Sequence, residues 1–425
     1  MAKLRVKNFG PIKDGFSEND GFMEITPVTV ICGNQATGKS TIAKLYSTLT
    51  WLEKSTVRTT IEKKKLSKIN FISYCKAHKL HGYFSDETEI KYIGNTYTIE
   101  YKNKTLFVDV NEDFENMVVG YNRPKIMYVP AERNLLTTME EVDNIKNLPI
   151  MLSFFLEEYN KAKKKSKSGI FALPISGIRV KYNKISQTMK VLTDNGTINI
   201  TDASSGVQSA TPLSLVTRYL AEEISENLFA NLKKLSVSER ELLKIWLDKI
   251  SGSAKFAEKS MEIFNRILYG ESFDEKDIEI IKNVLHFFFN TRFINIVEEP
   301  EQNLYPESQG KVLYELLECL NTNEHNQLII TTHSPYMLSY LTQSAKADEL
   351  LKKGVPAERI EKIVPVKSAV ASEKISIYET KEDGSIKLLK PYENLPSDEN
   401  LLNAALADGN ERFSKLLDLE VAFCK

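Results

Sequence analysis

The segment 33–40, GNQATGKS, constrains this chain more than any other feature. Its spacing, G-x-x-x-x-G-K-[ST], is typical of a loop whose backbone N–H groups turn inward on a polyphosphate at the positive end of the next helix. Apolar residues in 23–32 predict a strand that leads into the loop, and apolar residues at helical spacing in 40–53 predict a helix after it. The chain is therefore expected to contain an α/β domain with a phosphate-binding loop (P-loop).

The P-loop predicts a site for ATP and Mg²⁺. Lys39 would reach the β- and γ-phosphates, and the Ser40 hydroxyl would ligate Mg²⁺. The alternative is a chance match in a Gly-rich loop, which the flanking strand and helix disfavour. The residues expected to contact the nucleotide from this loop are Gly33, Asn34, Gln35, Ala36, Thr37, Gly38, Lys39, Ser40 and Thr41.

Two adjacent carboxylates follow an apolar strand that is expected at 293–297. Glu298 would help to hold Mg²⁺, and Glu299 would polarise the attacking water as general base. Taken alone, the segment could also be a strand that ends in surface carboxylates. Together with a P-loop, which requires acidic partners for metal and water, it predicts the catalytic half of the site.

A histidine follows a second apolar strand, expected at 328–332. His333 would lie at the carboxyl end of that strand, where ligands of parallel α/β sheets bind, and could hydrogen-bond the γ-phosphate. The alternative is a histidine that only packs at the strand end. We expect Glu299, Lys39 and His333 to be the catalytic residues.

The segment 202–209, DASSGVQS, is small and polar and opens a helix. Backbone amides at such a helix start form an anion site, although an ordinary capped loop is the alternative. One chain offers no second nucleotide to this segment, so the ATP of a second copy is its expected ligand. The residues expected to contact that ATP are Ser205, Gly206 and Gln208.

At this point the set of motifs resembles the ABC-type ATPases of the SMC, RecF and OLD (overcoming lysogenization defect) group, which includes stand-alone ATPases of anti-phage systems. The segment 6–9 (VKNF) is similar to the opening strand of that group, and 204–208 (SSGVQ) to its LSGGQ signature. The segment 298–306 (EEPEQNLYP) is similar to its Walker B motif and D-loop, and 332–335 (THSP) to its H-loop. Val207 in place of glycine and Glu298 in place of aspartate depart from the common pattern. Glu132 and Arg133 are the candidates for the Q-loop.

The resemblance implies an α/β fold: an ABC-type P-loop NTPase with a mixed central sheet, an antiparallel β subdomain and an inserted helical lobe. It divides the chain into an N-terminal half of the ATPase (1–133), a helical lobe with the signature (134–290), a part with Walker B and H-loop (291–345) and a C-terminal α/β extension (346–425). It also implies a homo-oligomer of at least two copies, in which ATP is sandwiched between the P-loop of one and the signature of another.

The function expected from the resemblance is that of a sensor or regulatory ATPase of an anti-phage system. The sequence after His333 has neither E-G-x-x-D nor D-x-D, so an effector such as a nuclease is expected to be a separate protein. The alternatives are a DNA clamp of the SMC or RecF kind and, less favoured, the ATPase subunit of a transporter.

Composition limits the other classes of protein to which the chain could belong. The formal net charge is −1, which implies no global attraction to nucleic acid or membrane, so DNA would need a local patch. No apolar stretch approaches a bilayer span and the N-terminus lacks a signal-peptide core, so we expect a cytoplasmic protein without a membrane partner.

The C-x-x-H-x-x-H run of Cys75, His78 and His81 has no second ligand pair and is interpreted as a helix rather than a zinc site. The basic run 161–169 is interpreted as a solvated linker.

Overall fold

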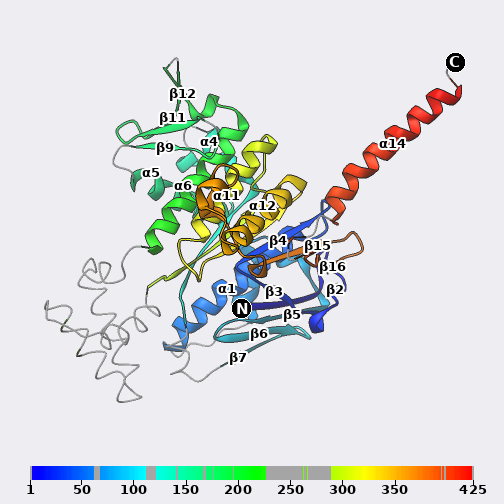
Figure 1. Ribbon diagram of the computed structural model, residues 1–425. Helices are drawn as coiled ribbons and strands as arrows, with labels where there is room; N and C mark the ends of the chain where they lie inside the picture. The colour runs from blue at the N-terminus through cyan, green and yellow to red at the C-terminus, as the bar shows by residue number, and fades with distance from the viewer. Residues whose placement is uncertain are drawn as a thin grey trace.

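The computed structural model describes residues 2–61, 68–111, 121–139, 142–165, 169–175, 177–194, 196–225, 262, 266, 289–393, 395–396 and 399–423. These residues form an α/β fold with three β-sheets, one mixed and two antiparallel (Figure 1). The expected fold class is confirmed. No helix among the described residues is long and apolar enough to cross a membrane.

A mixed seven-stranded sheet in the order β2-β16-β15-β4-β14-β13-β8 forms the centre. The strands β4, β8, β13, β14 and β15 run parallel, so their carboxyl ends meet at one edge, and β16 runs antiparallel to β15. The strand before the P-loop, β4, lies between β14 and β15. The bounds are β2 (Gly15–Phe16), β4 (Val28–Gly33), β8 (Pro124–Val129), β13 (Arg292–Glu298), β14 (Gln327–Thr332), β15 (Ile375–Thr380) and β16 (Ser385–Leu388).

The continuous apolar runs of the parallel strands arise because both faces of the sheet are covered. In β14, Leu328 and Ile330 face one hydrophobic core and Ile329 faces the other. Helix α1 (Lys39–Ile61) packs on the face of Ile329, while α6 (Ser205–Ser225) and α11 (Pro306–Leu320) contribute to the core on the opposite face. The P-loop, at the end of β4 and the start of α1, is therefore held on a fully packed scaffold.

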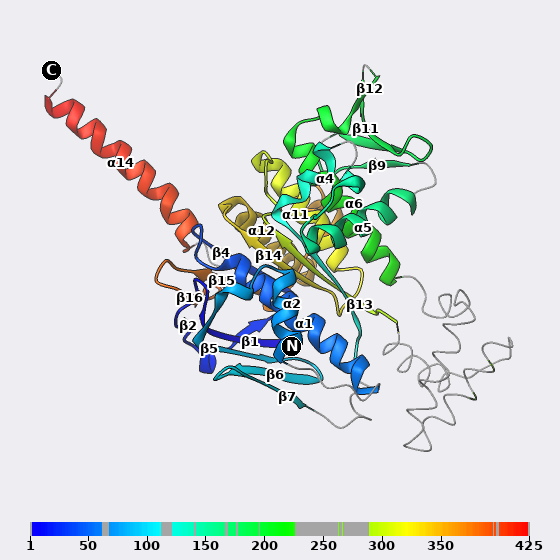
Figure 2. The ribbon, with the colours of Figure 1, turned by 180° about the vertical axis from the view of Figure 1, so that it is seen from behind.

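Two antiparallel sheets flank this centre (Figures 1 and 2). The predicted hairpin over 89–110 is confirmed as part of a five-stranded sheet, β3-β1-β5-β6-β7. The predicted pairing of 178–182 with 189–193 is confirmed in a four-stranded sheet, β12-β11-β10-β9. The bounds are β1 (Ala2–Phe9), β3 (Met23–Ile25), β5 (Phe84–Ile93), β6 (Tyr97–Lys102), β7 (Thr105–Val110), β9 (Ile170–Ala172), β10 (Arg179–Asn183), β11 (Thr188–Thr193) and β12 (Gly196–Asn199).

The other α-helices of the described residues lie around the sheets, except α14, which projects away from them (Figure 1). They are α2 (Lys68–Ala77), α4 (Leu135–Thr138), α5 (Ile150–Lys165), α12 (Pro335–Lys352), α13 (Ala357–Glu361) and α14 (Leu401–Phe423). The helical pattern predicted over 211–290 is seen in α6 up to residue 225, and most of the rest lies outside the described residues. Strands β15 and β16, from the expected C-terminal extension, join the central sheet.

The interpretation of 161–169 as a linker is wrong for its first half, because α5 continues to Lys165. Lys163 is only 9% exposed, and its ammonium lies 4.6 Å from the ring centre of Tyr159 and 5.4 Å from that of Tyr182. These cation–π contacts hold the basic run on the protein. A lysine-rich helix end can therefore resemble a solvated linker in the sequence alone.

Candidate nucleotide-binding site

The P-loop has the backbone that phosphate binding requires. Gly33 and Gly38 have φ of 138° and 104°, and Ala36 has φ of 60°, all in the left-handed region. At Gly33 a Cβ atom would lie 2.4 Å from the carbonyl oxygen of Thr380, so no larger residue fits. The loop residues Asn34, Gln35 and Ala36 are exposed, so the loop is open to a ligand.

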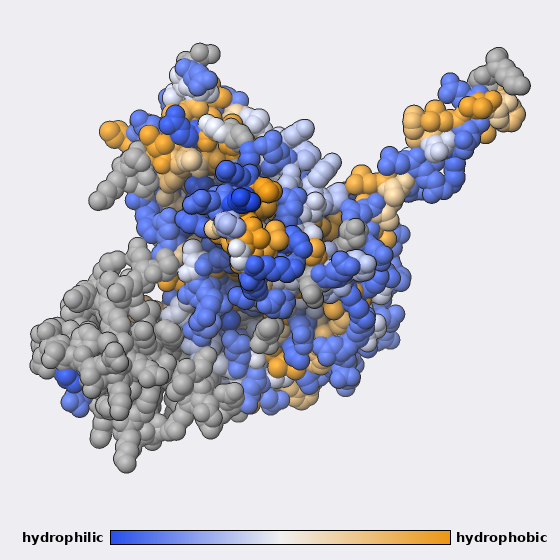
Figure 3. Space-filling view, in the orientation of Figure 1, coloured by the Kyte–Doolittle hydropathy of each residue, from blue (hydrophilic) through white to orange (hydrophobic). Residues whose placement is uncertain are grey.

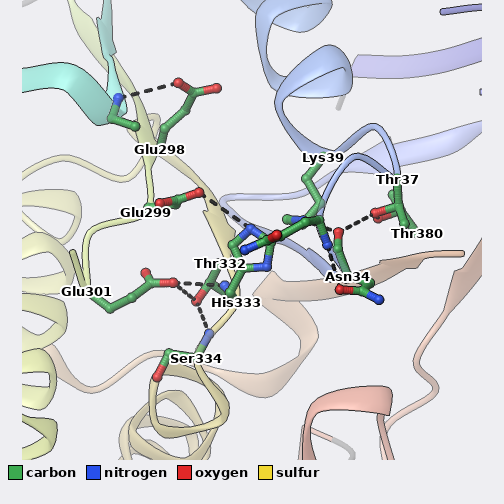
Figure 4. A network of polar contacts seen from close by, with 12 residues as sticks. Asn34, Thr37, Lys39, Glu298, Glu299, Glu301, Thr332, His333, Ser334 and Thr380 are labelled. Atoms are coloured by element: carbon green, nitrogen blue, oxygen red, sulfur yellow. Dashed lines mark hydrogen bonds and ion pairs between the residues drawn. The ribbon is translucent and has the colours of Figure 1, made fainter. Parts of the chain in front are cut away.

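Lys39 begins helix α1 and bends back over the loop. Its ammonium donates a 2.5 Å hydrogen bond to the carbonyl oxygen of Asn34, and the residue is 5% exposed (Figure 4). Burial lowers the pKa of Lys39, and the negative charge of Glu299 opposes this shift. A lysine that is partly desolvated and already curled over the loop is placed to neutralise phosphate oxygens.

Strand β15 braces the P-loop from the other side. The hydroxyl oxygens of Thr37 and Thr380 are 2.6 Å apart, and the Asn34 amide donates a 2.8 Å hydrogen bond to Glu382. The Thr380 hydroxyl also donates to the carbonyl oxygen of Cys32, at 3.2 Å. Thr380 and Glu382 were not predicted from the sequence. No local motif marks them, because only the pairing of β15 with β4 brings them to the loop.

The two carboxylates predicted after the apolar strand lie where β13 ends. Glu298 is 4% exposed, and one of its carboxylate oxygens accepts a long hydrogen bond of 3.4 Å from the N–H of Ala131. The other, Oε1, is buried without a hydrogen bond and lies 3.6 Å from the ammonium of Lys44. Glu299, the next residue, has φ of 44° and turns the chain sharply off the strand.

Arg133 holds this turn in place. It is 0% exposed, and its guanidinium donates two hydrogen bonds of 2.7 Å, one to the carbonyl oxygen of Glu298 and one to that of Glu299. Burial lowers the pKa of Arg133 to about 10, against the attraction of the surrounding carboxylates. Arg133 therefore braces the backbone between the two acids. Glu132, the other Q-loop candidate, lines a small cavity of about 60 Å³ with Lys44 and Glu298.

His333 contacts the acidic strand end. Its Nε2 lies 3.4 Å from Glu299 Oε1, and Figure 4 shows the imidazole beside the P-loop residues Asn34 and Lys39. This contact with His333 is the main cause that lowers the pKa of Glu299, with smaller help from Lys39 and Arg133. Lys39, Glu299 and His333, which are far apart in the sequence, therefore meet on one side of the P-loop.

Glu301 is a site residue that the sequence analysis did not single out. Its Oε1 accepts hydrogen bonds from the Thr332 hydroxyl at 2.7 Å and from the His333 N–H at 2.8 Å. Burial raises the pKa of Glu301. Its carboxylate links the segment after β13 to the residue that carries the imidazole. The run E-E-P-E contains this residue, but the sequence does not show which of its acids would turn inward.

The donor set fits a magnesium ion bound with phosphates. Ser40 lies in the first turn of α1 and is half-buried, and Glu298 keeps a buried carboxylate oxygen without a hydrogen bond. Hydroxyl and carboxylate oxygens are the ligands that Mg²⁺ prefers, with the rest of its octahedron supplied by phosphate and water. Among the described residues, no cluster of three or more His, Cys, Asp or Glu could hold a metal by itself. His78 of the C-x-x-H-x-x-H run packs against Tyr128 instead, with ring centres 4.8 Å apart.

The signature-like segment lies at the start of α6. Ser205 is exposed, and a Cβ atom at Gly206 would lie 2.7 Å from the carbonyl oxygen of Asn303. Gln208 is 7% exposed, and its amide donates to the carbonyl oxygens of Ile200 and Thr201 within the same chain, at 3.1 and 2.8 Å. The segment therefore presents Ser205 outward and uses Gln208 to fasten the helix start. Figure 1 shows α6 in the lobe that carries β9–β12, apart from β4.

One comparison with known proteins covers two of these motifs, those that follow β13 and β14. A sequence model described as an AAA ATPase domain matches residues 280–338, a stretch that contains Glu298, Glu299 and His333. The chain resembles the ABC-type ATPases of the SMC, RecF and OLD group in fold class and in the order of its motifs. A search of curated proteins found no match.

Solved structures of SMC heads are among those that the chain matches. An SMC head bound to the C-winged helix domain of ScpA has 11% identity and a TM-score of 0.39, with 91% of this chain and 95% of that chain covered. The SMC head domain from Thermotoga maritima has 10% identity and a TM-score of 0.36, with 92% and 98% covered. An Smc head with an extended coiled coil, bound to a ScpA domain derived from Pyrococcus furiosus, has 11% identity and a TM-score of 0.28, with 91% and 96% covered.

Proposed function

We propose that this chain binds ATP with Mg²⁺ on the P-loop and hydrolyses it. The observation that carries the proposal is the meeting of Lys39, Glu299 and His333 at one place, from three segments far apart in the sequence. A chance P-loop match would not bring a carboxylate and an imidazole to the same side of the loop.

Each residue then has a chemical role. Lys39 neutralises charge on the β- and γ-phosphates, and Ser40 and Glu298 hold Mg²⁺, which as a Lewis acid withdraws charge from the phosphates. Glu299 orients the attacking water and accepts its proton, a role that needs the ionised carboxylate that its lowered pKa favours. His333 donates a hydrogen bond toward the γ-phosphate from its place beside Glu299.

We further propose that a second copy completes the site. Ser205 is exposed at the start of α6, and the backbone amides of a first helical turn can bind an anion. Two copies arranged head to tail would each close this helix start over the ATP of the other. ATP binding would then promote assembly, and hydrolysis would promote release.

Nucleotide retention tests the catalytic assignment. Glu299→Gln keeps the shape of the side chain but cannot accept the proton, so we expect ATP to stay bound while turnover falls by about 10²–10⁴. Lys39→Ala should lose ATP binding itself. Chromatography of the nucleotide that remains bound after gel filtration measures both. If Glu299→Gln hydrolysed ATP at the wild-type rate, the assignment of the general base would be wrong.

As to its biological role, we propose a regulatory ATPase of an anti-phage system that acts through a separate effector. The support is the resemblance of the motifs to those of the group named above. Purifying the Glu299→Gln variant from its native cells separates this role from that of a DNA clamp. A trapped assembly that carries an effector protein supports the regulatory role, and one that carries only DNA supports the clamp.

A further inference from the structure

The C-terminal helix α14 leaves the body of the protein with its side chains in solvent. It contains 23 residues, Leu401–Phe423, none of which is buried (Figures 1 and 3). Its base is fixed, because the N–H of Leu401 donates a 2.7 Å hydrogen bond to Glu379 of β15 and Leu402 packs on the main core. The large apolar side chains that are more than two-fifths exposed are Leu401, Leu406, Phe413, Leu416, Leu417, Leu419, Val421 and Phe423.

Four of these side chains, Leu406, Phe413, Leu416 and Phe423, lie on one face of the helix. Steps of four and three residues lead along one face of α14, which we call the seam: Leu402, Leu406, Gly409, Phe413, Leu416, Glu420 and Phe423. This alternation is the heptad spacing of helices that pack against another helix. Helices gain most of their stability from packing of an apolar face, and exposed apolar faces mark interaction sites. We therefore expect α14 to pack against a partner.

Two positions on the seam are not large and apolar, and they complement each other. In the part of the chain that the structure describes, Gly409 has nothing within 4 Å of the place of a Cβ atom, so its lack of a side chain serves no contact there. Glu420 is the one charged residue on the seam. In two antiparallel helices centred between Phe413 and Leu416, these two residues face each other, and Glu420 passes over the gap at Gly409 of the second copy.

The same antiparallel register also brings opposite charges together. Arg412 lies one turn after Gly409, so it comes within reach of Glu420 of the second copy. Among the described residues Arg412 is paired only with Asp408, at 2.6 Å on the exposed surface, and such an exposed ion pair contributes little stability and can be exchanged. A parallel pair would place Glu420 against Glu420 and leave a gap at Gly409, so the antiparallel register is favoured.

We propose that α14 pairs antiparallel with α14 of a second copy of this chain, without any need for nucleotide. In the pair, Phe413 faces Leu416, Leu406 faces Phe423, and Glu420 forms an ion pair with Arg412. This contact is separate from the ATP-dependent one, and it gives the chain two surfaces for binding copies of itself.

Sedimentation velocity in nucleotide-free buffer tests the pairing, because the ATP-dependent contact is then absent. We expect wild-type protein to be dimeric at micromolar concentration and Leu416→Asp to raise the dissociation constant at least about a hundredfold, since each dimer contains the change twice. Ala407→Asp, which adds the same charge on the opposite face of α14, should stay dimeric. A monomeric wild-type protein, or equal loss of the dimer in both variants, would overturn the proposal.

Charge reversal separates this pairing from docking of α14 elsewhere. Glu420→Arg and Arg412→Glu should each weaken the dimer by like-charge repulsion. An equimolar mixture should form a heterodimer, because both contacts then join opposite charges, one as in wild type and one reversed. Recovery in the mixture supports the antiparallel register. If the mixture stays monomeric, or if α14 binds anionic vesicles while the protein remains monomeric, the register is refuted.

Discussion

Replacement of Arg133 by lysine would test how the catalytic turn is held. The guanidinium reaches the carbonyl oxygens of Glu298 and Glu299 through two hydrogen bonds of 2.7 Å. A lysine ammonium lacks the planar pair of N–H groups of a guanidinium and cannot bond both carbonyl oxygens, so at least one hydrogen bond is lost. Hydrogen bonds to charged groups contribute about 1.5–3 kcal/mol each, so we expect the free energy of unfolding to fall by about that amount. Because Arg133 is completely buried, water cannot replace the lost partner.

The same change should reduce ATP turnover more than ATP binding, because the turn carries Glu299 but not the P-loop. A displacement of the general base by about 1 Å can lower the rate about a hundredfold. Urea denaturation and steady-state ATPase kinetics measure the two effects, with Arg359→Lys on the exposed surface as the matched control. Wild-type stability and kcat in Arg133→Lys would refute the view that these bonds hold the turn.

Three further predictions concern other parts of the site. Gly33→Ala should abolish ATP binding and destabilise the fold by about 1–3 kcal/mol, because the φ of Gly33 is left-handed and the new methyl group would collide with Thr380. Calorimetry measures both the binding of ATP and the stability, with Gly82→Ala, whose methyl group would lie in open space, as the control. Burial raises the pKa of Glu301 in the native state above its value in the unfolded state, so the native state loses stability as the pH rises from the unfolded pKa to the native one. Glu301→Gln should therefore gain stability relative to wild type from pH ~4.5 upward. Urea titrations at several pH values measure this, and a stability difference that does not change with pH would contradict it. Gln208→Ala should lower the free energy of unfolding by about 1–2 kcal/mol without raising KM for ATP, whereas a large rise in KM would mean that the amide contacts nucleotide.

Much of the fold and site could be predicted because local patterns determine them. The apolar run before Gly33 has both faces buried in β4, as its composition indicates. The segments ending at Glu299 and His333 became neighbours because β13 and β14 are adjacent parallel strands whose carboxyl ends share one edge. Motif order was therefore enough to predict which residues meet.

The contacts that sequence reasoning missed depend on pairings between distant segments. Thr380 reaches the P-loop only because β15 pairs with β4, which no spacing predicts. Arg133 and Gln208 carry polar groups that could equally have faced a ligand, and only the packed structure shows that they satisfy backbone carbonyls of their own chain. Lys163, expected in a mobile linker, has a long aliphatic stem that can lie against aromatic rings while its charge remains near the surface.

Complementation between two inactive variants tests most directly the central claim that two copies share each ATP site. Lys39→Ala removes the P-loop function, and Ser205→Arg blocks the signature-like surface, so each variant alone should be inactive. In an equimolar mixture the heterodimer contains one intact site, so we expect recovery of about one quarter of the wild-type rate if subunits mix at random. Full activity of Ser205→Arg alone, or no recovery in a mixture of two folded variants, would contradict it.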